Sequence, residues 1–276
     1  MSTSGNSQGT GTIPRTETTR LRDIDVRYRV SGQGSPVLMA HGLAEDHLTW
    51  RPQQEALAGY RTYAYDLRGH GGTTLGAPDG TPEQLRDDLL EFLARVTGPA
   101  PVVGFSLGGT IALAAAARDR RLVTGVIALG ASTKVGRAAA GFYAERIGRA
   151  GDRARLAQAL REDSEAGLHD PSSNAEAVGA ARVAAIGDGV GYANAAAAMA
   201  ALHDRPLTPA LAGIRCPVTV IGGEYDTFCP RKAADIILTA LPQAEYREIS
   251  GAGHLMNIDR PDAVTAAVRE ALEGMS

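Results

Sequence analysis

The chain has 276 residues, 44% of them hydrophobic and 21% charged, which is the composition of a globular protein large enough for one domain with an insertion. Its formal net charge of −3 and isoelectric point of about 6.1 give no electrostatic reason to expect nucleic acid or an anionic membrane as a partner. Two cysteines are too few for a disulfide framework or a zinc site, so we expect reduced thiols in a cytoplasmic protein.

The first residues of the chain do not resemble a targeting segment. Residues 1–17 are rich in Ser, Thr and Gly and lack the apolar run of a signal peptide, so we expect a disordered tail. The longest apolar stretch, residues 195–202, is too short to span a bilayer. Residues 18–30 predict two short strands, and a Gly-rich turn follows at residues 31–34.

Short apolar runs then alternate with helical patterns along the chain. We expect strands at residues 37–40, 60–65, 101–105, 123–129, 218–221 and 245–249. Thr81, Pro82 and Gln84 form a capping-box pattern that begins a helix, and two more helices are expected at residues 107–118 and from Pro261 onward. The alternation predicts an α/β fold with a mostly parallel, doubly wound sheet that has helices on both faces.

One region interrupts the alternation. Residues 132–213 contain alanine-rich helical stretches with many charges and no good strand pattern. We therefore expect a helical cap over one edge of the sheet, with residues 18–131 and 214–276 forming the core domain. The arginines of the cap could bind a substrate carboxylate, but they alternate with acidic residues, which favours a solvated face.

The sequence Gly-Phe-Ser-Leu-Gly at residues 104–108 matches the G-x-S-x-G pattern of a nucleophilic serine. A second match, around Ser7, has no strand before it and no helix after it. Ser106 follows an apolar run and precedes a helical one, as the sharp strand-to-helix turn of this motif requires. The context therefore favours Ser106 as a nucleophile over a serine in an ordinary glycine-rich turn.

A serine nucleophile requires two backbone donors and a base. His41 and Gly42 follow the strand at residues 37–40, so the N–H groups of Leu43 and Leu107 are the expected oxyanion-hole donors. Gly42 allows the backbone to turn there, whereas His41 is expected to have a structural role.

For a G-x-S-x-G serine, the expected chain order of the triad is serine, then the acid, then histidine. The acid and the base must therefore both follow Ser106. Of the three histidines after Ser106, only His254 lies outside the predicted cap, in a loop just after a predicted strand. Asp226 and Glu224 both follow the strand at residues 218–221, and we prefer Asp226 because it lies further along the loop.

With these residues the chain resembles the α/β-hydrolase superfamily, and within it most closely the 3-oxoadipate enol-lactonase-like branch of small esterases and lactonases. The resemblance covers nearly the whole chain from about Thr18 and rests on His41-Gly42, residues 65–71, the pattern around Ser106, residues 223–226 and residues 251–254. It implies a cap at the insertion and no cofactor. Epoxide hydrolases and haloalkane dehalogenases differ, since they attack with aspartate where this chain has Ser106.

Some residues near these motifs could have either a functional or a structural role. Phe105, Phe228, Met256 and Leu43 flank the expected catalytic positions and could line an apolar acyl pocket or belong to the core. Arg68 and His70 are expected to hold a loop, and Trp50 to pack in the core.

The leading function is hydrolysis of a small carboxylic ester or lactone through an acyl-enzyme, without a metal. Alternatives are carbon–carbon bond hydrolysis of a vinylogous diketone, perhydrolysis, or a receptor that binds a small molecule on the same fold. The alanine-rich cap favours short acyl chains over lipid substrates. The expected partner is the small-molecule substrate, and the sequence leaves open whether the chain forms a homo-oligomer.

Overall fold

The protein is described by a computed structural model over residues 14–275. The first thirteen residues of the predicted tail lie outside this range. The first strand begins at Arg15, three residues earlier than expected, because residues 15–21 pair antiparallel with the second strand. Within the described residues, no helix combines the length and apolar character that crossing a bilayer requires.

Eight strands form one sheet, in the order β1-β2-β4-β3-β5-β6-β7-β8. The two pairings of β2 are antiparallel and all others are parallel, as the alternating pattern predicted. The strands are β1 (Arg15–Leu21), β2 (Ile24–Ser31), β3 (Pro36–Ala40), β4 (Arg61–Tyr65), β5 (Ala100–Phe105), β6 (Val123–Leu129), β7 (Val218–Gly223) and β8 (Glu245–Ile249).

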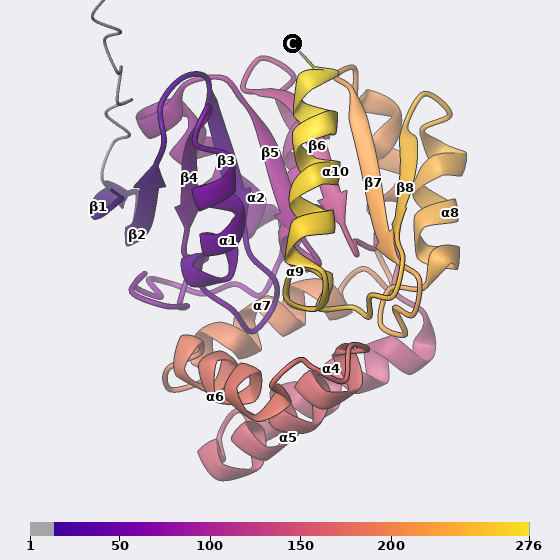
Figure 1. Cartoon of the computed structure of the whole chain (residues 1–276). Helices are drawn as coiled ribbons and strands as arrows, with labels where there is room; N and C mark the ends of the chain where they lie inside the picture. The colour runs from indigo at the N-terminus through magenta and orange to yellow at the C-terminus, as the bar shows by residue number, and fades with distance from the viewer. Residues whose placement is uncertain (1–13, 276) are drawn as a thin grey trace, which may run out of the picture.

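Helices cover both faces of the sheet (Figure 1). The core helices are α1 (Arg51–Ala56), α2 (Pro82–Phe92), α3 (Leu107–Arg118), α8 (Arg231–Ala240), α9 (Met256–Asp259) and α10 (Pro261–Glu273), with short helical turns at η1 (His47–Trp50), η2 (Leu93–Thr97) and η3 (Thr208–Gly213). Successive side chains of a strand point to opposite faces of the sheet. Strand β5 therefore contributes to the hydrophobic cores on both faces. Val102 packs with α2 and α3, whereas Val103 and Phe105 pack with α10.

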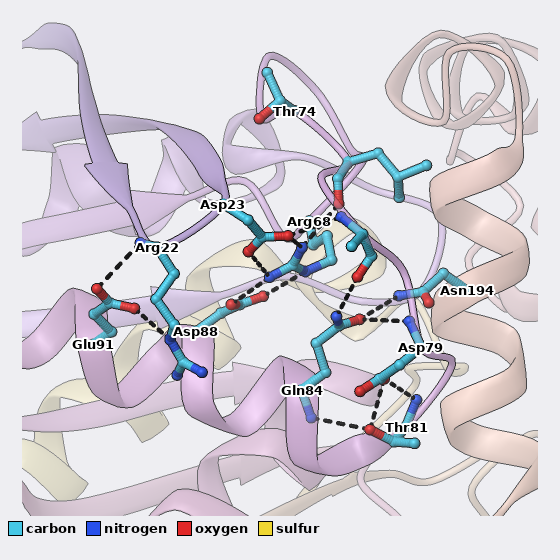
Figure 2. A network of polar contacts seen from close by, with 12 residues as sticks. Arg22, Asp23, Arg68, Thr74, Asp79, Thr81, Gln84, Asp88, Glu91 and Asn194 are labelled. Carbon is cyan, nitrogen blue, oxygen red and sulfur yellow. Dashed lines mark hydrogen bonds and ion pairs between the residues drawn. The ribbon is translucent and has the colours of Figure 1, made fainter.

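Helix α2 begins as predicted, with one difference. The Thr81 side chain accepts the N–H of Gln84 at 3.2 Å, which is half of a capping box. The Gln84 side chain does not return to Thr81 but accepts the N–H of Asp79 and donates to the carbonyl of Ala77. It thereby holds the loop before the helix (Figure 2).

Four helices between β6 and β7 lie beneath the carboxyl ends of the parallel strands (Figure 1). They are α4 (Arg137–Arg149), α5 (Arg153–Gly167), α6 (Ala175–Ala185) and α7 (Val190–Ala200). Tyr192 of α7 and Leu156 of α5 pack against Ala44 in the loop after β3. This small third core joins the four-helix cap to the sheet edge where β3 and β5 end.

A polar network around the buried Arg68 joins the loop after β4 to α2, to the turn between β1 and β2 and to α7 (Figure 2). Arg68, 3% exposed, donates to Asp88 of α2 and to Asp23 between β1 and β2, with N···O distances of 2.7 to 2.9 Å. Asn194 of α7 accepts the N–H of Gly80 in the same loop at 2.7 Å. Arg68 therefore has the loop-holding role that the sequence predicted.

Candidate active site

Ser106 lies on the sharp turn between β5 and α3. Its backbone has φ 51° and ψ −116°, a strained conformation for a residue with a side chain. The turn requires glycine on both sides. A Cβ atom on Gly104 would lie 2.4 Å from the carbonyl carbon of Gly108, and one on Gly108 would lie 2.2 Å from the carbonyl oxygen of Ala40. The G-x-S-x-G spacing therefore follows from steric fit.

His254 lies between Ser106 and Asp226. Its Nε2 atom is 3.1 Å from Ser106 Oγ, and its Nδ1 atom is 2.8 Å from Asp226 Oδ2. With the carboxylate accepting from Nδ1–H, Nε2 is left free to accept the serine hydroxyl. The structure thus brings His254 into contact with Ser106, 148 positions earlier in the chain, and with Asp226, 28 positions earlier.

The backbone fixes the Asp226 carboxylate. Its Oδ1 atom accepts the N–H groups of Phe228 and Cys229 at 2.9 and 2.8 Å, which leaves Oδ2 for the histidine. Glu224 lies elsewhere, since its Oε2 atom accepts from Ser250 Oγ and Gly251 N–H. Of the two acids that the sequence offered, Asp226 is the one that contacts His254.

Leu43, in the loop after β3, lines the same cavity as Ser106. Leu67 N–H donates to His41 Nε2 at 2.9 Å, so the proton of the neutral imidazole is on Nδ1, which donates to Gly42 O at 2.7 Å. The N–H of a trans peptide points opposite to its carbonyl, so Leu43 N–H points away from His41. Among the described residues neither Leu43 N–H nor Leu107 N–H has an acceptor.

Two more side chains hold this loop. Glu45 Oε2 accepts Gly42 N–H at 3.0 Å, and His70 Nε2 lies 2.8 Å from Leu43 O. His41 and His70 are both buried, and burial lowers the pKa of each, for His41 to about 3. The His41 ring is therefore a neutral support for the backbone. His70, whose Nδ1 atom also lies 3.0 Å from Arg68 O, supports the same loop, so both residues have the structural role that the sequence predicted.

A cavity of about 360 Å³ opens onto Ser106 and His254 between the sheet edge and the cap. Phe105, Phe228, Leu43 and Leu107 line it, and the rings of Phe105 and Phe228 lie 5.1 and 5.3 Å from the His254 ring.

The prediction that Met256 lines the pocket is wrong. Met256 begins α9, is fully buried, and packs with the core cluster on the α10 face of the sheet. Its neighbour Leu255 lines the cavity in its place, because the turn into α9 directs adjacent side chains to different sides. Trp50 is also fully buried in this core, as predicted.

Asp46, His47 and Asp66 are the described residues whose potential ligand atoms lie close together. Asp66 Oδ1 already accepts from the backbone N–H and the Nδ1 atom of His47, each at 2.7 Å, and Oδ2 accepts from Gly72 N–H. The carboxylate is thus engaged in holding the loop after β4.

The sequence profile of the alpha/beta hydrolase fold matches residues 35–261. The chain belongs to the α/β-hydrolase fold family. The expected resemblance to this family and to its small esterases is confirmed.

Among relatives of this hydrolase is a Mycobacterium tuberculosis protein named as a non-heme bromoperoxidase, 28% identical over 89% of this chain and 96% of the relative. Another is the pimeloyl-[acyl-carrier protein] methyl ester esterase of Aromatoleum aromaticum, 28% identical over 86% of this chain and 98% of the relative.

The solved structure of the enol-lactonase from Burkholderia xenovorans is similar over the whole fold. It has a TM-score of 0.82 and 26% identity, and the match covers 93% of this chain and all of that one. The fold class predicted from the sequence is therefore confirmed, and this protein is a hydrolase.

Sequence reasoning missed the residues that the cap contributes to the cavity of this hydrolase. The larger ones are Phe142, Tyr143, Asp163, Arg182, Tyr192 and Met199, and the small residues are Ala138, Ala139 and Gly167. Helical periodicity identifies which residues of a cap helix share a face, but not which face turns toward the sheet. Glu45 was also missed, although its place three residues after Gly42 is within reach of that backbone N–H.

Proposed function

We propose that this protein is a serine hydrolase that cleaves a small carboxylic ester or lactone through an acyl-enzyme. One observation carries the proposal, namely the chain of contacts from Ser106 Oγ to His254 Nε2 and from His254 Nδ1 to Asp226 Oδ2. A serine hydroxyl is a weak nucleophile, and a neutral imidazole whose far side is held by a carboxylate is the base that activates it.

The reaction follows from these positions. Ser106 Oγ attacks the carbonyl carbon while its proton passes to His254 Nε2, and the oxygen that becomes negative accepts from the N–H groups of Leu43 and Leu107. The intermediate collapses as His254 returns the proton to the departing alkoxide. Water then attacks the acyl carbon, again giving its proton to His254, and the acid leaves with Ser106 restored. For a lactone, the departing alkoxide stays attached to the acyl chain.

The size and lining of the cavity support short acyl groups. Alanine-rich helices form much of the cap, and the cavity of about 360 Å³ is at the small end of ligand pockets. Rates with a series of 4-nitrophenyl esters should be highest for short acyl chains and decline with length. A maximum at long chains, with activation by emulsified lipid, would contradict the small-substrate assignment.

Perhydrolysis is a second candidate, supported by the relative named as a non-heme bromoperoxidase. In that reaction hydrogen peroxide replaces water, its oxygen attacks the acyl carbon, and a peracid leaves as Ser106 regains its proton. Peracid formation from an ester and peroxide, compared with acid formation without peroxide, separates the two candidates. Loss of both activities in Ser106→Ala is expected for either.

A further inference from the structure

Arg182 of α6 extends from the cap into the wall of the catalytic cavity. It is half-buried, and its Nη1 atom donates to Ser164 Oγ of α5 at 3.0 Å. Ser164 is itself fixed, because its hydroxyl donates to Leu160 O at 2.6 Å. One corner of the guanidinium is thus anchored to the neighbouring cap helix, so its position in the cavity wall is defined.

The rest of that guanidinium is not satisfied by the protein. Its Nε atom is buried without a hydrogen-bond partner, and among residues 14–275 Arg182 forms no ion pair. Leaving a buried charged donor unpaired is costly, and an arginine in such a place normally has a carboxylate or phosphate across from it. The unpaired Nε–H is therefore an observation that points to a ligand.

The acidic groups of the cavity wall do not compensate Arg182 within hydrogen-bonding distance. Asp163 is engaged by Arg146, whose Nε and Nη2 atoms donate to its two oxygens at 2.9 and 2.6 Å. Glu45 is buried with Oε1 unpartnered. Burial raises the pKa of this carboxyl more than the nearby charge of Arg182 lowers it, which favours the neutral form of Glu45 and weakens its repulsion of an anion. Among the described residues that line the cavity, Arg182 is the single arginine or lysine.

We infer that Arg182 is a substrate-binding residue, and that the preferred substrate is a small ester or lactone that carries a carboxylate on its acyl portion. The substrate carboxylate would accept from the Arg182 guanidinium, which lines the cavity, while the ester carbonyl lies at Ser106. Arg182 and Ser106 line one cavity of about 360 Å³, so the spacer between the two substrate groups must fit within it. This inference rests on the proposed ester hydrolysis and specifies its substrate class.

Two methyl esters of similar size test the inference. Monomethyl succinate carries a carboxylate, and methyl pentanoate has an alkyl end in its place. The wild-type enzyme should have a kcat/KM for monomethyl succinate at least about 10-fold above that for methyl pentanoate, because hydrogen bonds to charged groups are the stronger ones. Arg182→Gln should lower kcat/KM for monomethyl succinate about 10- to 100-fold and change that for methyl pentanoate less than about 3-fold.

Two further variants refine the result. Arg182→Lys keeps the charge but loses the planar fork of donors, so its loss with monomethyl succinate should be intermediate. Arg153→Gln removes an exposed arginine of α5 that does not line the cavity, and it should match the wild type with both esters. Equal losses with both esters in Arg182→Gln would assign Arg182 a merely structural role and overturn the inference.

A binding measurement distinguishes failure of this inference from failure of the proposed function. In Ser106→Ala protein, which keeps the cavity, calorimetry should give a lower Kd for monomethyl succinate than for methyl pentanoate, and Arg182→Gln in that background should abolish the difference. Equal or weaker binding of monomethyl succinate overturns the inference, whatever the catalytic result. If wild-type protein instead fails to turn over 4-nitrophenyl acetate, the proposed hydrolysis fails on its own.

Discussion

His41 Nε2 accepts the backbone N–H of Leu67 at 2.9 Å, which links the end of β4 to the loop that presents Leu43. A protonated ring would lose this acceptor, and the ring is fully buried. The contact thus requires a neutral imidazole, in agreement with a pKa lowered by burial to about 3 from an ordinary value of 6.5.

The free energy of unfolding should therefore depend on pH through His41. Between pH 3 and 6.5 the unfolded chain binds a proton at this position and the folded chain does not. The His41 contribution to stability is thus complete above pH 6.5 and decreases as the pH falls toward 3, by about 2 kcal/mol at pH 5.

Urea unfolding at pH 7 and pH 5 measures this dependence. His41→Gln should be less stable than the wild type at pH 7 but lose about 2 kcal/mol less on acidification. His169→Gln, at an exposed histidine, should follow the wild type. The same pH dependence in His41→Gln and the wild type would contradict the neutral-ring account.

Two glycine substitutions with opposite expected effects test the turn at Ser106. Gly108→Ala would place a Cβ atom 2.2 Å from Ala40 O, so backbone must move and the variant should lose at least about 2 kcal/mol of stability and most of its activity. Gly141→Ala, in the exposed face of α4 with nothing near the added atom, should gain about 0.5 to 1 kcal/mol. A tolerated Gly108→Ala would show that the steric argument is wrong.

The strands and the site residues of the core were predictable because each follows from a local constraint. Strand β6 matches its prediction at both ends, since a run of apolar β-formers lies between a charged stretch and a glycine. Ser106, Asp226 and His254 each lie in the loop or turn that follows a strand, and parallel strands bring their carboxyl ends to one edge.

The cap was predictable only in outline. That residues 132–213 form helices follows from composition, but the direction in which each helix faces depends on tertiary contacts such as Tyr192 against Ala44. For this reason the sequence could not distinguish Arg182, which lines the cavity, from Arg146, which pairs with Asp163.

The choice of acid can be tested with two isosteric substitutions. Asp226→Asn should fold but lower kcat about 10³- to 10⁴-fold, because the amide no longer fixes the proton-accepting tautomer of His254. Glu224→Gln should stay within about 3-fold of the wild type, since its carboxylate bonds Ser250 and Gly251. Steady-state rates with 4-nitrophenyl acetate give both values, and a larger loss in Glu224→Gln would reverse the assignment.

Arg68 should contribute much more to stability than an exposed arginine. Arg68→Gln leaves the buried carboxylate of Asp88 without its ion-pair partner, so we expect a loss of about 3 kcal/mol in the free energy of unfolding. Arg231→Gln breaks the exposed pair with Asp235 on α8 and should cost less than about 1 kcal/mol. Equal costs in urea unfolding would mean that the network in Figure 2 is dispensable.

The central claim is that Ser106 becomes covalently acylated during turnover. Mixing the protein with 4-nitrophenyl acetate, quenching in acid within the first turnovers and analysing the digested protein by mass spectrometry measures this directly. The account predicts one acetyl group on the peptide that contains Ser106, an initial burst of nitrophenol matching the enzyme concentration, and neither signal in Ser106→Ala. Steady turnover with no acetylated Ser106, or an acetyl group on another residue that persists in Ser106→Ala, would contradict it.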